Sequence, residues 1–454
     1  MEPLKEFTKP LTQFLSTLRT LPTDLVNRTK LLLLDYLGAY LAGRKTQPSQ
    51  VLVALVGQRP VKSILSAVNT AFRYGVASHA LEIDDAHRYA CVHPGSVVFS
   101  TALPLAEFLG SSGRDFISSV VAGYEAICRV AYGLDLKEHY RRGFHPTGTC
   151  GPFGATATAA KLLRLNSSQL ERAFGIVGSM GAGSMQFLMD GAWTKPFHSG
   201  WAAHNGIQAA LLAKEGFKGP AGILEGPYGF WKSHGEADDK SEVLKDLSKE
   251  YELLKTTVKN YPCCGHTQSS ISALVELIRQ RNLDPDQVEE VEIRVSNLAM
   301  PSVATPEELK RNPRTAADAM WSVYYGAAFT LQKGNLTLEA YNPKYIRSKT
   351  IHRLMDRVHV LPDSSLDEAF PDRWPSIVTV RTHAGETITS RVDYPKGDPE
   401  NFLSWEELVE KFCQLSNRLL SDKKRRMVIE EVKNLEKAKE VGKILRHFRP
   451  SALP

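Results

Sequence analysis

A cluster of acids and histidines in the first quarter of the chain carries residue types suited to proton transfer. Residues 79–87 read HALEIDDAH, and His93-Pro94-Gly95 follows six residues later. Histidine titrates near neutral pH and exchanges protons with a neighbouring carboxylate. In the alternative interpretation, Asp84 or Asp85 caps a helix and the histidines lie on the surface. The spacing by itself leaves both interpretations open.

Two further segments place a basic residue near the start of a helix. Residues 143–152 (GFHPTGTCGP) hold His145 in an expected loop ahead of an alanine-rich helix that begins near Gly154. A helix N-terminus presents free N–H groups and attracts anions. In residues 190–206, a proline follows Lys195 and fits the first turn of a helix. A lysine there is unfavourable unless it shares an anion with the helix. A structural turn and a solvent-facing lysine are the respective alternatives.

A fourth segment, residues 259–268 (KNYPCCGHTQ), lies where the composition changes. Its adjacent cysteines do not match the spaced pairs of zinc or iron–sulfur sites, so we expect buried thiols. His266 is of interest because clefts form at domain junctions. The chain lacks dinucleotide, Walker, zincin and nucleophile-elbow motifs, which argues against the common nucleotide enzymes, zinc proteases and serine hydrolases.

The elements expected to position these clusters change in type along the chain. Residues 1 to about 265 are mostly helical by periodicity. Residues 288–295 alternate as a half-buried strand does, and residues 377–382 and 387–392 flank a short turn as a hairpin does. From Trp405 onward the pattern is helical again. The chain is therefore expected to be mainly α, with one α+β segment.

Composition and charge exclude several classes of protein. The formal net charge is +6 over 454 residues, and acids and bases interleave in the charged segment 422–446. Such a segment is typical of a solvated helix face, so we expect no nucleic-acid partner. We find no secretory signal, no apolar run long enough for a membrane and no disulfide framework among the six cysteines. The expected location is the cytoplasm.

In this order and spacing, the four clusters resemble the MmgE/PrpD family, which includes 2-methylcitrate dehydratase, cis-aconitate decarboxylase and iminodisuccinate epimerase. The most specific pieces are the Glu-Ile-Asp-Asp run with His93-Pro94-Gly95, the run 143–147, and Lys195 with residues 198–200. The resemblance implies a large helical domain, residues 1–266 completed by 398–454. It also implies a smaller α+β lid, residues 267–397, a homodimer, no metal or other cofactor, and an active site between helical domain and lid.

The resemblance also implies roles for individual residues. The expected catalytic residues are His145, Lys195, Asp85 and His93, with His145 or the Asp85/His93 pair transferring protons and Lys195 anchoring a carboxylate. The expected substrate-binding residues are Glu82, Asp84, His198, His266 and Lys259.

Three positions depart from patterns seen within the family. Ala86 stands where decarboxylase-like members have threonine, and Trp201 stands where some branches have arginine. Gln268 stands where many members have histidine, which leaves open whether His266 or Gln268 fills that role.

The reactions of the family share one difficult step, which is making or quenching a carbanion beside a carboxylate. Fixed positive groups must stabilise that charge. We therefore predict a lyase for a small di- or tricarboxylic acid, with dehydration of the 2-methylcitrate type ranked first. Epimerisation or racemisation is second, and decarboxylation of the cis-aconitate type is third. A non-catalytic helical scaffold is the alternative from another class, but it would leave the clustered histidines unexplained.

Overall fold

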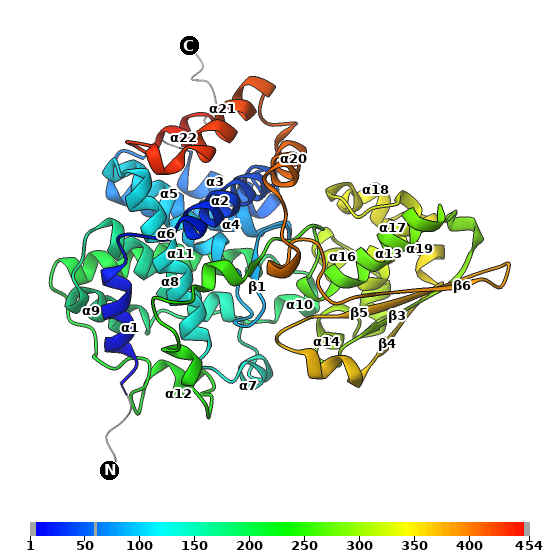
Figure 1. Cartoon of the computed structure of the whole chain (residues 1–454), viewed down its shortest axis with the longest axis horizontal. Helices are drawn as coiled ribbons and strands as arrows, with labels where there is room; N and C mark the ends of the chain where they lie inside the picture. Colours follow the sequence, from blue (N-terminus) through cyan, green and yellow to red (C-terminus); the bar gives the residue numbers. More distant parts are fainter. Residues whose placement is uncertain (1–5, 59–60, 449–454) are drawn as a thin grey trace.

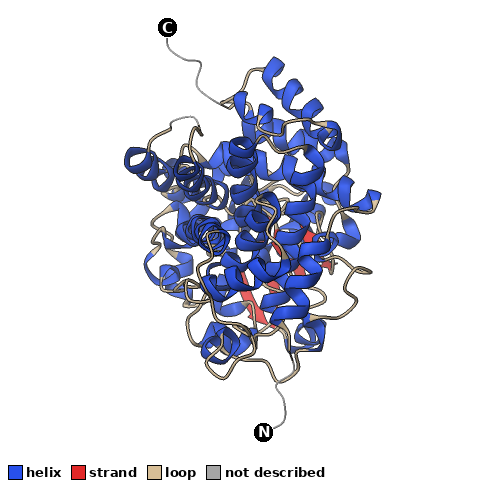
Figure 2. Ribbon diagram, turned by 90° about the vertical axis from the view of Figure 1, so that its left-hand side faces the viewer, coloured by secondary structure: helices blue, strands red, loops and turns tan. Residues whose placement is uncertain are grey.

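The computed structural model describes residues 6–58 and 61–448, and it is mainly helical, as the sequence predicts. Figure 1 shows the helices gathered on one side and four strands, with further helices, on the other. Strands are a minor part of the view in Figure 2. Within the described residues, no helix combines the length and apolar character needed to cross a bilayer.

The larger hydrophobic core takes side chains from both ends of the chain, from Phe7 to Val258 and from Leu403 to Phe448. Its N-terminal helices are α1 (Thr8–Thr17), α2 (Thr23–Gly43), α3 (Gln47–Val56), α4 (Ile64–His79), α5 (Pro94–Leu109), α6 (Gly113–Ala131), α7 (Leu136–Arg141), α8 (Pro146–Leu162), α9 (Ser167–Val177), α10 (Phe187–Asp190), α11 (Thr194–Lys214) and α12 (Phe230–His234). The C-terminal helices are α20 (Trp405–Ser416), α21 (Asp422–Lys433) and α22 (Lys443–Arg446). Helix α20 packs on α2, which joins the two ends (Figure 1).

A second core runs from Tyr261 to Ile388 and belongs to the lid side of the molecule. The helices here are α13 (Gln268–Arg281), α14 (Met300–Val303), α15 (Glu307–Arg311), α16 (Ala316–Met320), α17 (Val323–Lys333), α18 (Pro343–Ile346) and α19 (Lys349–Met355). The strands are β3 (Val288–Val295), β4 (Val358–Pro362), β5 (Ser376–Thr382) and β6 (Thr387–Val392), in sheet order β4-β3-β5-β6. The predicted strand is β3, and the predicted hairpin is the antiparallel pair β5–β6.

Along the chain, buried side chains pass from the larger core to the second core between Val258 and Tyr261. They return to the larger core between Ile388 and Leu403. The predicted domain limits, 266/267 and 397/398, stay predictions. A two-stranded sheet of β1 (Ala86–His87) and β2 (Thr256–Thr257) lies within the helical domain and ties the acidic cluster to the first crossing.

The expected loop over residues 143–152 is wrong from Pro146 onward, because α8 begins there. A proline fits the first helical position, where its missing N–H costs nothing. The glycines that suggest a loop serve close packing instead. A Cβ on Gly148 would lie 2.5 Å from the Ala182 carbonyl oxygen, and one on Gly154 would lie 2.9 Å from Cβ of Ile127. His145 consequently lies directly at the N-terminus of α8.

Candidate active site

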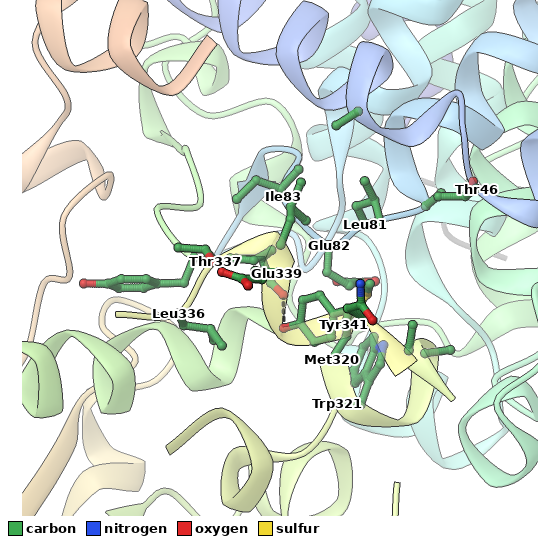
Figure 3. A pocket seen from close by; sticks show the side chains of 18 of the residues that line it. Thr46, Leu81, Glu82, Ile83, Met320, Trp321, Leu336, Thr337, Glu339 and Tyr341 are labelled. Atoms are coloured by element: carbon green, nitrogen blue, oxygen red, sulfur yellow. Dashed lines mark hydrogen bonds between the residues drawn. The ribbon is translucent and has the colours of Figure 1, made fainter. Parts of the chain in front are cut away.

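A cavity of about 1470 Å³ lies between the helical domain and the lid. His79, Glu82 and Lys195 line it from the helical domain, and Trp321 and Tyr341 line it from the lid. Figure 3 shows the side chains of Glu82, Trp321 and Tyr341 close together in this cavity. The cavity is large enough for a small acid together with water.

His79 ends helix α4 and pairs with the carboxylate of Asp84, with His79 Nδ1 lying 2.6 Å from Asp84 Oδ2. Burial lowers the pKa of His79, although Asp84 opposes this, and His79 in turn holds the pKa of Asp84 below its usual range despite burial. An ionised carboxylate only accepts, so Nδ1 carries the proton and Nε2 keeps a lone pair. Among the described residues, His79 Nε2 has no hydrogen-bond partner. His79 is therefore a neutral imidazole whose Nε2 lone pair is available to accept a proton.

Three further histidines surround His79. The ring centroid of His93 lies 4.7 Å from that of His79, and the ring of His145 stacks on His79 at 6.1 Å. His145 Nδ1 lies 3.1 Å from Nδ1 of His198, so one ring donates to the other. Burial lowers the pKa of His93 and His145, helped by Lys195, and burial lowers that of His198 to about 4. All of these rings are neutral at physiological pH.

Glu82 joins the two lysines of the site. Lys259 Nζ donates to Glu82 Oε2 at 2.9 Å, and Lys195 Nζ donates to the other oxygen. Burial alone would raise the pKa of Glu82, but the two ammonium groups hold it well below its usual range. Glu82 has φ of 52°, a left-handed conformation that costs free energy in a residue other than glycine and is typical of functional sites. Lys195 Nζ also lies 4.7 Å from the centre of the Trp321 ring.

The Asp85 carboxyl group points away from this cluster. Its oxygens accept hydrogen bonds from the Gly95 backbone N–H at 2.8 Å and from the Tyr124 hydroxyl. Burial raises the pKa of Asp85 to about 8, so the group is largely protonated at neutral pH. A Cβ at position 95 would lie 2.6 Å from Asp85 Oδ2, so glycine is required there. The expected Asp85/His93 pair exists only through the main chain, since His93 Nδ1 lies 2.8 Å from the Asp85 carbonyl oxygen.

The structure brings together most of the residues predicted from the sequence. Glu82 and Lys195 line the cavity. Asp84 and Lys259 contact residues that line it, and His93, His145 and His198 form the layer of rings beside His79.

His266 and Gln268 lie elsewhere. The His266 ring, in the short 3-10 helix Gly265–Thr267, stacks on Trp374 with centroids 4.2 Å apart. The Gln268 side-chain amide forms hydrogen bonds with the backbone of Tyr261 and Cys263. Neither side chain lines the cavity, and which of the two fills the histidine role stays an open prediction.

His79 lines the cavity at the centre of this cluster, but the sequence prediction leaves it out of the site. Its signal in the sequence was the acid five residues later, Asp84, but several other histidines lie equally near acids. The rings of His79, His93 and His145 are also the group of described residues whose nitrogens could hold a metal ion, since these nitrogens lie within 4.8 Å of one another.

Comparison with known proteins agrees with the resemblance drawn from the clusters. The MmgE/PrpD N-terminal domain matches residues 10–242, and the MmgE/PrpD C-terminal domain matches residues 261–437. This chain belongs to the MmgE/PrpD family. The first matched segment contains the clustered histidines and acids and Lys195 that were described above. Lys259 lies between the two segments, just before the second one.

Several curated MmgE/PrpD relatives match along nearly their whole length. A cis-aconitate decarboxylase-like protein, oryM, of Aspergillus oryzae is 28% identical, covering 94% of this chain and 93% of the relative. Human cis-aconitate decarboxylase is 28% identical, covering 90% of this chain and 87% of the relative. Cis-aconitate decarboxylase of Aspergillus terreus is 25% identical, covering 94% and 92%.

Proposed function

We propose that this MmgE/PrpD protein is a carboxy-lyase that removes CO2 from an unsaturated tricarboxylic acid of the cis-aconitate class. The observation that carries the proposal is the match, over most of both chains, to relatives named for that reaction. These relatives favour decarboxylation over the dehydration that the sequence analysis ranks first.

The cavity offers the groups that such a reaction needs. Breaking the bond between carbon and the leaving carboxylate releases CO2 and leaves an electron pair on carbon, delocalised toward a neighbouring carboxylate. The Lys195 ammonium, buried and fixed by Glu82, supplies positive charge where this negative charge spreads. A proton must then be delivered to carbon to complete the product.

We assign the delivery of this proton to His79. A substrate carboxylate beside the ring raises the pKa of His79, because a nearby anion favours the imidazolium. Asp84 stabilises that imidazolium through Nδ1, and Nε2 donates the proton to carbon. His79 then regains a proton from solvent. The roles that the sequence assigns to His145 and His93 remain proposals that mutation can test.

One observation favours a second candidate. The unliganded His79 is neutral and has a free Nε2, which suits removal of a proton from carbon beside a carboxylate. Such a first step begins dehydration of the 2-methylcitrate type and epimerisation. The two candidates differ in whether CO2 or a proton leaves carbon first.

A single screen separates these reactions. The protein is incubated in deuterated buffer with cis-aconitate, 2-methylcitrate, citrate and an imino diacid derived from aspartate, and products are followed by proton NMR. Decarboxylation gives CO2 and one deuterium in the product, either on the carbon that carried the lost carboxylate or on the other end of the allylic system. Water loss from 2-methylcitrate, or exchange without CO2, would replace the proposal by the second candidate.

We further propose a homodimer that forms through the helical domain. Three aromatic side chains near the start of α11 are exposed, Trp193 (46%), Phe197 (39%) and Trp201 (36%). Phe197 and Trp201 stack, with ring centroids 5.8 Å apart. The stacked, exposed pair Phe197 and Trp201 is the kind of aromatic surface that is typical of protein interfaces, while Trp193 also lines the cavity. This helix also carries Lys195, so the interface would lie near the cavity.

A further inference from the structure

Lys195 and Lys259, with Glu82 and Asp84, form what we call the floor of the site. The positive charges of its two lysines are already balanced by its two carboxylates. Glu82 contacts both Lys195 and Lys259, and Asp84 lies 4.0 Å from Lys259. A substrate with three carboxylates therefore needs further positive groups. Three other lysines that line the cavity are also paired, Lys344 with Glu339, Lys396 with Glu407 and Lys411 with Asp35.

Lys310 differs from all of these. It lines the cavity from the last turn of α15 and is only 7% exposed. In the part of the chain that the structure describes, no carboxylate lies within ion-pair distance of Lys310, and its Nζ donates only to the Ser302 carbonyl oxygen, at 2.6 Å. The other unpaired cations of the cavity wall are exposed, namely Lys45, Arg279, Arg314 and Arg418. Within the described residues, Lys310 is thus the buried cation of this wall that has no anionic partner.

The position of Lys310 relative to the floor of the site is fixed by its neighbours. The Ser322 hydroxyl donates to the Lys310 carbonyl oxygen at 2.6 Å, which holds α15 beside Trp321. Trp321 in turn lies against Lys195. Cys264 interacts electrostatically with Lys310 and, less strongly than with Glu82 and Lys259, with Lys195. Lys310 and Lys195 therefore both line the cavity close to Trp321 and share Cys264 as an electrostatic neighbour.

A buried ammonium with one neutral partner is costly. Burial lowers the pKa of Lys310 to about 8, and the Cys264 thiol and then Asp318 oppose this shift. An ammonium has three N–H donors, and the Ser302 carbonyl uses one of them. An anion bound beside Lys310 would use the remaining donors and remove the cost of the unpaired charge.

We propose that Lys310 anchors a second carboxylate subsite on the lid wall, which binds the distal carboxylate of a tricarboxylic acid whose reacting end lies at His79 and Lys195. This inference rests on the proposed function for its substrate class. The subsite makes the enzyme prefer tricarboxylates over dicarboxylates, because only the former supply an anion for Lys310 after the floor of the site is engaged.

The test uses binding alone, so it does not depend on turnover. Affinities of the full chain for tricarballylate (propane-1,2,3-tricarboxylate) and for succinate are measured by calorimetry at pH 7. Lys310→Met is expected to reduce the preference for tricarballylate over succinate by about 10- to 100-fold, as expected for losing a hydrogen-bonded charge. Lys310→Arg should retain most of the preference. Lys344→Met, which removes a paired and exposed lysine of the same wall, is the matched control and should leave the preference unchanged.

Lys310→Gln keeps a donor for the Ser302 carbonyl while removing the charge, so it replaces Lys310→Met if the latter fails to fold by circular dichroism. An unchanged preference in the folded neutral variant, or no tricarballylate binding to the unmodified protein at millimolar concentration, would overturn the subsite. The proposed function is judged separately, by CO2 release from cis-aconitate. CO2 release with an unchanged preference in Lys310→Met would remove the subsite and leave the function standing.

Discussion

The Nδ1 atom of His79 lies 2.6 Å from Oδ2 of Asp84, and this contact fixes which nitrogen of the imidazole carries the proton. Both side chains are almost fully buried. A buried histidine–carboxylate pair keeps one ring nitrogen available for proton transfer and stabilises the ring when it becomes protonated. His79 lines the cavity, so the pair connects the buried charge cluster with the space that a substrate would occupy.

His79→Ala should therefore lower kcat by about 100- to 10,000-fold, with little change in the affinity for tricarballylate. Asp84→Asn should also lower kcat, because the amide no longer favours the productive tautomer or the imidazolium. His383→Ala, a change on the exposed turn between β5 and β6, is the control and should leave kcat unchanged. Near-normal turnover in folded His79→Ala would return the proton-transfer role to His145 or His93.

Lys195 and His145 should be separable by kinetics. Lys195→Ala is expected to raise KM and to lower kcat, because the ammonium anchors a carboxylate and also stabilises the developing negative charge. His145→Ala is expected to lower kcat and kcat/KM equally if it acts only in the transition state. Steady-state kinetics on the identified substrate, with thermal melting of each variant, measures both. Weakened binding of tricarballylate in His145→Ala would make His145 a substrate ligand instead.

The raised pKa of Asp85 predicts a pH-dependent stability. The group has a pKa of about 8 in the folded protein, above its ordinary value near 4, so folding takes up a proton between these limits. This contribution is fully present below pH 4 and is lost as the pH rises toward 8. Asp85→Asn does not titrate, so the stability of the unmodified protein relative to this variant should fall by roughly 2–5 kcal/mol from pH 4 to pH 8.

Thermal melting of both proteins at pH 5, 6, 7 and 8 follows this difference. Asp393→Asn serves as the control, because Asp393 has a lowered pKa and is therefore ionised throughout this pH range. A difference between the unmodified protein and Asp85→Asn that stays constant with pH would contradict the assignment of Asp85 as a protonated, buried group.

Turnover should not require a metal ion. The nitrogens of His79, His93 and His145 lie close enough to hold one, but the proposed chemistry uses His79 for proton transfer and Lys195 for charge stabilisation. Activity after exhaustive dialysis against a chelator is expected to equal activity before it. A large loss that zinc or iron restores would assign the three rings to a metal centre.

The exposed aromatic face of α11 predicts the oligomeric state. One chain has a mass of 50.4 kDa, and light scattering should report twice this value at micromolar concentration. Trp201→Glu should shift the mass toward one chain, because it places a charge within apolar contact surface. Tyr228→Glu alters a side chain that is 97% exposed and should leave the mass unchanged. A single-chain mass for the unmodified protein would remove the dimer proposal.

Local sequence patterns could predict the strand β3, the hairpin β5–β6 and the place of Lys195 in the first turn of α11, because these depend on periodicity and on proline within a few residues. The same patterns were misleading at residues 143–152. Glycines that permit a turn in an isolated segment permit close helix packing in a folded one, and only the neighbouring helices distinguish the two.

The order and spacing of four clusters were enough to identify the family and the mainly α fold, since both depend on residue types along the chain. Which acid meets which base was decided only by tertiary structure. Lys259 reaches Glu82 across 177 residues, and Tyr124 takes the Asp85 carboxyl group that the sequence assigned to His93. Likewise, the lack of a carboxylate beside Lys310 among the residues that the structure describes depends on the segments folded around it. Coulomb energies and desolvation depend on distances in space and on burial, and these are set by packing between segments remote in sequence.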